Sequence, residues 1–73
     1  MDALYYKIMD CIYVLLYGSE WEDIVILLTK KEAIRESIKH PRLRVEVFSK
    51  NTTSGYIPTY NFYENGQLYK NVN

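Results

Sequence analysis

The chain has 73 residues, with nine basic and nine acidic side chains and a formal net charge of zero. A chain of this length has room for one hydrophobic core, so we expect a single small domain over residues 1–73. Zero net charge excludes a sequence-wide electrostatic attraction to nucleic acids or to anionic membranes. Apolar residues make up 48% of the chain, which indicates a globular protein rather than a disordered one.

The apolar stretches are too short to cross a bilayer. Residues 11–17 and 24–28 are each well below the roughly 20 residues of a membrane helix. The first ten residues lack the basic region and the cleavage site of a secretory signal. The single cysteine, Cys11, cannot form an internal disulfide and lies in an apolar run, where we expect a buried structural thiol. We therefore expect an intracellular protein without a membrane partner.

Residues 11–17 predict a first strand, because they are β-branched, aromatic or leucine apart from the cysteine. Both of its faces are apolar, one formed by Ile12, Val14 and Leu16 and the other by Cys11, Tyr13, Leu15 and Tyr17. Such a strand is expected inside a sheet. After a short loop, residues 23–28 predict a second strand that pairs with the first as an antiparallel hairpin.

Residues 30–39 predict a helix. Thr29 and Glu32 form a capping box at its start, in which each side chain bonds the backbone N–H of the other. The residue before Pro41 is pushed out of the helical region, so the helix ends at His40. Its sheet-facing stripe is small and consists of Ala33, Ile34, Ser37 and Ile38. Because so short a helix is marginal alone, it must be stabilised by packing on the sheet.

Three more strands are predicted after the helix. Residues 43–48 alternate between apolar and mostly charged positions, and Pro58 is expected to delay the next strand until residues 59–63. Asn65 and Gly66 suit a tight hairpin turn that leads into residues 67–72. The order ββαβββ predicts a two-layer α+β domain, with an antiparallel sheet of about five strands and one helix on one face. A short additional helix is expected within residues 1–9.

Five segments carry a resemblance: residues 21–26 (WEDIVI), 31–34 (KEAI), 37–39 (SIK), 45–48 (VEVF) and 55–63 (GYIPTYNFY). Over residues 12–68 the chain resembles small uncharacterised proteins encoded by nucleocytoplasmic large DNA viruses of the mimivirus and marseillevirus kind. The resemblance implies a viral origin and a role in the virion or at the interface with host proteins, including a host-cytoplasmic location. It implies no active-site residues.

The sequence carries no catalytic or metal-binding motif that we recognise. One histidine and one cysteine do not make a zinc site, and His40 is better explained as a helix C-terminal residue than as a partner of Cys11. Glu20, Glu22 and Asp23 surround Trp21, where we favour a solvated loop with Trp21 folded against the core over a carboxylate site. We expect no cofactor and no enzymatic activity, and rank a small enzyme as the third choice.

Aromatic residues are the most informative group, because tyrosines on a sheet face can close a subunit contact or stack on bases. One helix covers one face, and Tyr13, Leu15 and Tyr17 are expected on the other. We predict a protein-binding or structural protein, either a homodimer or a complex with another protein. The predicted interaction residues are Tyr13, Tyr17, Trp21, Tyr56, Tyr60, Phe62, Tyr63 and Tyr69.

Two alternatives stay open for these aromatic residues. They could pair with one another across the sheet and have only a structural role. They could also bind single-stranded nucleic acid, which would require basic residues beside them, namely Lys7, Arg42, Arg44, Lys50 or Lys70. The zero net charge and the acidic Glu46 argue against nucleic acid.

Overall fold

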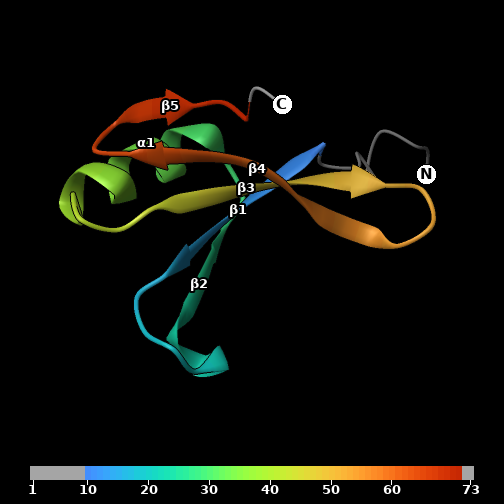
Figure 1. The fold of residues 1–73 in the computed structure, drawn as a ribbon, viewed down its shortest axis with the longest axis horizontal. Helices are drawn as coiled ribbons and strands as arrows, with labels where there is room; N and C mark the ends of the chain where they lie inside the picture. Colours follow the sequence, from blue (N-terminus) through green and yellow to red (C-terminus); the bar gives the residue numbers. More distant parts are fainter. Residues whose placement is uncertain (1–9, 72–73) are drawn as a thin grey trace, which may run out of the picture.

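The computed structural model describes residues 10–71, which form a five-stranded antiparallel sheet in the order β2-β1-β3-β4-β5 with one helix, α1, on one face (Figure 1). The elements are β1 (Cys11–Leu16), the 3-10 helix η2 (Trp21–Asp23), β2 (Ile24–Leu27), α1 (Lys30–Lys39), β3 (Val45–Asn51), β4 (Gly55–Glu64) and β5 (Gln67–Tyr69). The predicted α+β class and the order ββαβββ are confirmed. The helix expected in residues 1–9 lies outside the described residues.

Strands β1 and β2 form the predicted antiparallel hairpin, and β1 is an interior strand as expected, because β3 pairs with its other side. The hairpin ends in η2, and this end projects away from the rest of the molecule (Figure 1). Gly18 is needed where the chain leaves β1, since a Cβ atom there would overlap the side chain of Asp23. The backbone ladder continues beyond β1, because the Tyr17 N–H donates to the Asp23 carbonyl at 3.0 Å.

Helix α1 begins and ends where its local signals predict. The Thr29 Oγ1 accepts from the Glu32 N–H at 3.1 Å, as expected for the N-cap. The Glu32 carboxylate accepts from the Leu28 N–H at 3.2 Å instead of from Thr29, so the second half of the capping box is displaced by one residue. At the other end the His40 N–H donates to the Glu36 carbonyl at 3.0 Å, and Pro41 follows.

The core lies between α1 and the three central strands. Its buried hydrophobic side chains are Leu15, Ala33, Val45, Val47 and Tyr63. Ser37 is also fully buried, and its hydroxyl donates to the Ile34 carbonyl and accepts from the Gly66 N–H, both at 2.8 Å. One buried hydroxyl therefore ties the helix to the turn between β4 and β5. The other predicted stripe residues are less covered: Ile34 is half-buried and Ile38 is exposed.

Strand β4 differs from the prediction, because it begins at Gly55 and Pro58 lies within it, paired with Phe48. The expected delay at Pro58 was wrong. Since β5 covers only Phe62–Glu64, β4 has a single neighbour at Pro58, and a missing N–H is tolerated there. The β3–β4 register then shifts, and Tyr60 takes a positive φ of 68° in the irregular segment.

The turn between β4 and β5 matches the prediction. Asn65 and Gly66 have φ values of 49° and 85°. Both residues therefore lie in the left-handed region that a tight two-residue hairpin turn requires. Gly66 is also close to the helix, because a Cβ atom there would lie 3.1 Å from Ile38. This turn joins the sheet to the far end of α1.

Candidate interaction surface

The sheet face opposite α1 is the candidate surface, and we call it the open face. In antiparallel strands, directly opposed residues share a face, so the register identifies its members. One row crosses all five strands and consists of Ile26, Val14, Glu46, Phe62 and Tyr69. Neighbouring members are Ile12, Leu16, Ile24 and Phe48. The open face therefore has an aliphatic half on β1 and β2 and an aromatic half on β3, β4 and β5.

The prediction that Tyr13 and Leu15 lie on the uncovered face was wrong. Leu15 is buried in the core and Tyr13 packs against that core. The physical reason lies in β3, because Leu15 is paired with Val45 and Tyr13 with Val47. The helix covers the face that carries the two valines, and Glu46 remains on the open face, where water can reach it.

Tyr13 and Tyr63 form a pair within the core instead of a binding surface. Their ring centroids are 6.3 Å apart at an interplanar angle of 59°. Burial raises the pKa of both hydroxyls above 10.0, and the nearby Cys11 thiol raises the pKa of each further. Cys11 itself packs against the core, but it is half-buried, whereas a buried thiol was predicted. The structural reading of aromatic pairing thus holds for these two tyrosines.

Tyr17 and Trp21 lie at the projecting end of the β1–β2 hairpin. Trp21 is 79% exposed, so the expectation that it folds against the core was wrong. The local reason is η2, whose start is fixed by the Asp23 carboxylate accepting from the Glu20 N–H at 3.2 Å. This turn holds Trp21 at the surface. Of the three carboxylates near Trp21, that of Asp23 is hydrogen-bonded within the turn.

The aromatic half of the open face is built from stacked groups. Phe62 stacks on Tyr69 with ring centroids 5.2 Å apart and an interplanar angle of 13°. The Arg44 guanidinium lies 4.0 Å from the Phe62 ring centroid. Phe62 therefore has a tyrosine and an arginine beside it, and Glu46 lies in the same row. Because the Phe62 ring already contacts Tyr69 and Arg44, this half of the open face is an ordered aromatic and polar surface.

Tyr56 and Tyr60 lie in the part of β4 that β5 does not cover. The Lys50 ammonium lies 5.4 Å from the Tyr56 ring centroid. Tyr60 is exposed at the irregular segment, where the Thr59 hydroxyl donates to the Val47 carbonyl at 2.8 Å. The eight predicted interaction residues are thus divided among the core, the hairpin end, the aromatic half and the part of β4 that β5 does not cover, and they do not form one surface.

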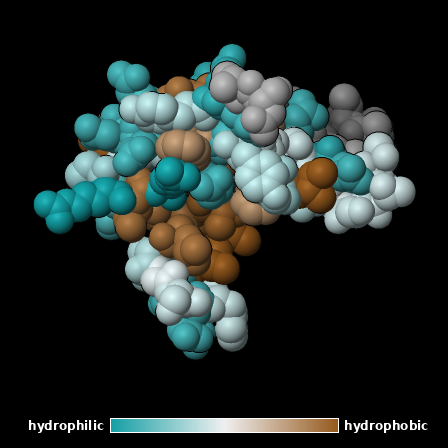
Figure 2. All heavy atoms as spheres, viewed as in Figure 1, coloured by the Kyte–Doolittle hydropathy of each residue, from teal (hydrophilic) through white to brown (hydrophobic). Residues whose placement is uncertain are grey.

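The aliphatic half of the open face is the part that sequence reasoning missed. Leu16 is 48% exposed and Ile26 is 58% exposed, and Ile24 beside them is exposed as well. Figure 2 shows a continuous hydrophobic area over the β1–β2 hairpin where it leaves the body of the protein. The signal was present in the sequence, because residues 24–27 (IVIL) contain no polar position. A strand with one solvated face would normally alternate.

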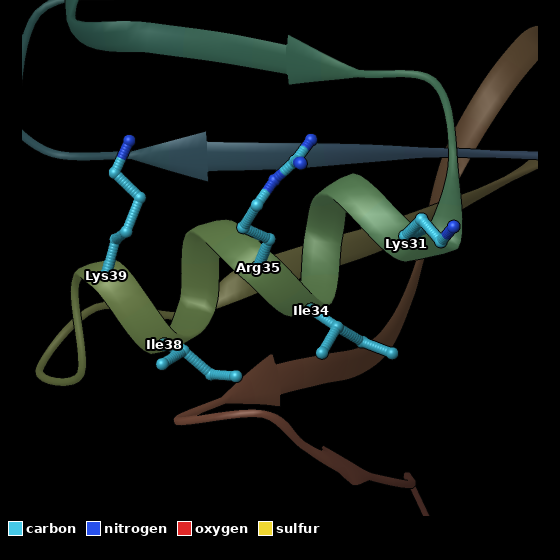
Figure 3. Close-up of a pocket in the computed structure, with 5 residues that line it drawn as sticks. All are labelled: Lys31, Ile34, Arg35, Ile38 and Lys39. Atoms are coloured by element: carbon cyan, nitrogen blue, oxygen red, sulfur yellow. The ribbon is translucent and has the colours of Figure 1, made fainter.

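A second surface runs along the outer side of α1. It is a groove of about 370 Å³ lined by Ile34 and Ile38 together with Lys31, Arg35 and Lys39. Figure 3 shows the two isoleucines directed toward β4 and the Arg35 and Lys39 side chains directed toward β1 and β2. The groove therefore combines an apolar floor with positive charge. No Asp, Glu, Ser or Cys is among these lining residues, so the groove offers no carboxylate base and no hydroxyl or thiol nucleophile from them.

The titratable side chains are dispersed. The His40 Nε2 lies 3.7 Å from the Glu36 carboxylate at the end of α1, as a helix C-terminal histidine would. Within residues 10–71, no group of three or more His, Cys, Asp or Glu residues could hold a metal ion. In the same part of the chain, no helix is long and apolar enough to span a membrane.

Comparisons with protein-family models, with curated proteins and with solved structures found no match to this chain. The resemblance to proteins of large DNA viruses therefore stays a prediction.

Proposed function

We propose that this protein is a non-enzymatic binding domain whose open face docks against another protein surface or another copy of the chain. The observation that carries the proposal is the aliphatic half, where Leu16, Ile24 and Ile26 present branched side chains to solvent on adjacent strands. Isolated apolar side chains are normal on a protein surface, but a contiguous patch marks an interaction site. In this small domain the patch lies beside an ordered aromatic half.

The two halves together resemble a protein interface more than a ligand site. Interfaces combine an apolar centre with aromatic and arginine side chains and a polar rim. Here Arg44, Phe62 and Tyr69 supply the aromatic and cationic groups, and Glu46 supplies an acceptor between the halves. The resemblance to viral proteins supports placing this role in a virion or in contact with a host protein.

Single-stranded nucleic acid is the second candidate, because Arg44 and Lys50 both lie over aromatic rings. Against it, Phe62 already stacks on Tyr69 and contacts Arg44, so bases would have to displace these contacts. Glu46 in the same row would repel phosphate. Titration with a labelled single-stranded oligonucleotide at low and moderate salt tests this candidate, since binding that weakens steeply with salt would favour it.

The test of the proposal is a pair of leucine substitutions. Leu16→Lys places a charge within the aliphatic half, at the end of the interior strand β1 and opposite Ile24. Leu68→Lys is the matched control, because Leu68 is 42% exposed and pairs with Tyr63 on the helix side of the sheet. We expect Leu16→Lys to weaken self-association or partner binding at least about tenfold, because a charge would replace an apolar contact in the interface. Equal behaviour of the two variants would contradict the proposal.

A further inference from the structure

Strand β2 forms one edge of the sheet, and within residues 10–71 no other strand pairs with its outer side. Natural edge strands are usually blunted by charged residues, proline or a bulge, because their unpaired backbone groups can recruit another strand. β2 has none of these devices: its four residues are Ile24, Val25, Ile26 and Leu27. The opposite edge is formed by β5, which has three residues, begins with Gln67 and is followed by Lys70, and by the part of β4 that β5 does not cover, which contains Pro58. The two edges of the described sheet are therefore very different.

The direction of the free backbone groups on β2 follows from the ladder with β1. The bond from the Tyr17 N–H to the Asp23 carbonyl makes these two residues a hydrogen-bonded pair. Hydrogen-bonded and non-hydrogen-bonded pairs alternate in an antiparallel ladder. Val25 and Leu27 therefore turn their N–H and C=O groups toward β1, and Ile24 and Ile26 turn theirs outward. Past the strand, the Leu28 N–H is bonded by the Glu32 carboxylate, so the outward set ends there.

We propose that β2 pairs antiparallel with β2 of a second copy, which joins the two sheets into one. With Ile24 opposite Ile26 of the second copy, and the reverse, all four outward N–H and C=O groups of each copy are hydrogen-bonded, in four bonds in total. Because opposed positions then carry side chains on the same face, the two open faces become continuous. This pairing uses the edge of the sheet and does not require the open face to bind anything.

Charge complementarity selects the antiparallel orientation. The chain is acidic just before β2, at Glu20, Glu22 and Asp23, and has a net positive charge just after it, where Lys30 and Lys31 outnumber Glu32. Antiparallel pairing brings the acidic end of each strand beside the basic end of the other, twice by symmetry, whereas parallel pairing would bring like charges together. Both the hydrogen-bond pattern and the charges are thus self-complementary.

The experiment combines amide hydrogen exchange with variants in which the charges at the two ends of β2 are reversed. Sedimentation equilibrium over a concentration series measures the oligomeric state, and NMR hydrogen exchange is followed at each amide of β2. In the dimer, the Ile24 and Ile26 amides should exchange at least about tenfold more slowly than at dilutions where monomer dominates. One double variant carries Glu20→Lys and Glu22→Lys, and the other carries Lys30→Glu and Lys31→Glu. Each variant alone should dimerise more weakly than the original chain. An equimolar mixture of the two variants should recover the affinity. Circular dichroism confirms that each variant is folded.

The outcomes are distinct. Recovery in the mixture together with protection of the Ile24 and Ile26 amides supports edge pairing. A chain that is monomeric at every concentration overturns it. A dimer that Leu16→Lys disrupts, but in which these two amides exchange freely, also overturns it and assigns the contact to the open face. The fluorescence of Trp21, the sole tryptophan and the residue next to Glu22, provides an independent signal of association at this end of the strand.

Discussion

Replacement of Ser37 by alanine tests how α1 is fastened to the sheet. The Ser37 side chain is fully buried, and its hydroxyl accepts the Gly66 N–H at 2.8 Å across a separation of 29 residues. The same hydroxyl donates to the Ile34 carbonyl at 2.8 Å. This second bond matters less, because a helix carbonyl already accepts from the N–H four residues later. The substitution therefore acts mainly by leaving the Gly66 N–H without its acceptor.

The magnitude follows from these contacts. A backbone N–H that loses its partner away from water costs about 1–3 kcal/mol, and Gly66 is half-buried, which favours the lower half of that range. Alanine recovers about 0.5 kcal/mol through its better helix propensity. We expect the free energy of unfolding to fall by about 1 kcal/mol, and in a domain of this length the melting temperature should fall by about 4–8 °C.

Thermal and urea unfolding followed by circular dichroism measure this loss. Ser54→Ala is the matched control, because Ser54 is exposed and bonds Asn51 through its backbone N–H, which the substitution keeps. Exchange of the Gly66 amide gives a local readout that should accelerate only in Ser37→Ala. If Ser37→Ala and Ser54→Ala unfold with equal midpoints, the bond from Gly66 does not hold the helix and the reasoning fails.

Two further predictions concern tyrosines. Tyr60→Gly should raise the free energy of unfolding by about 0.5–1 kcal/mol, because Tyr60 is exposed and its φ of 68° strains a residue with a Cβ atom; an unchanged or lower urea midpoint would argue against strain at this position. Burial and then the Cys11 thiol raise the pKa of Tyr13, and burial likewise raises the pKa of Tyr63. As the pH rises, these two hydroxyls therefore lose their protons in the unfolded chain before they do so in the folded one. Stability from these groups should therefore be complete below pH 10.0 and fall as the pH rises through the folded-state pKa values; urea midpoints on either side of that pH test this, and Tyr13→Phe should flatten the decline.

The parts of the fold that depend on local chemistry could be predicted from the sequence. Thr29 caps the helix, Pro41 follows its end, and Asn65 and Gly66 supply the positive φ values of the last turn. Each of these features is determined by a few neighbouring residues, so no knowledge of tertiary contacts is required. Strand ends were less accurate, because the extension of β4 to Gly55 depends on its pairing with β3.

The choice of the covered face could not be made from β1 alone, because both of its faces are apolar. The deciding residues are on β3, where Val45 and Val47 alternate with Glu46. A register that pairs Leu15 with Val45 transfers the polarity of β3 onto β1. The information was therefore in the sequence, but it became usable only once the register between strands distant along the chain was known.

The distribution of the core makes stability and association interdependent. Its buried hydrophobic residues come from α1, β1, β3 and β4, and β2 contributes only the half-buried Val25 and Leu27. β2 is therefore held mainly by its ladder with β1, and it should open more easily than β3. A partner that binds only the folded hairpin stabilises it by mass action. Consequently, protection of the Val25 and Leu27 amides should also rise with protein concentration, whereas that of the β3 amides should change less.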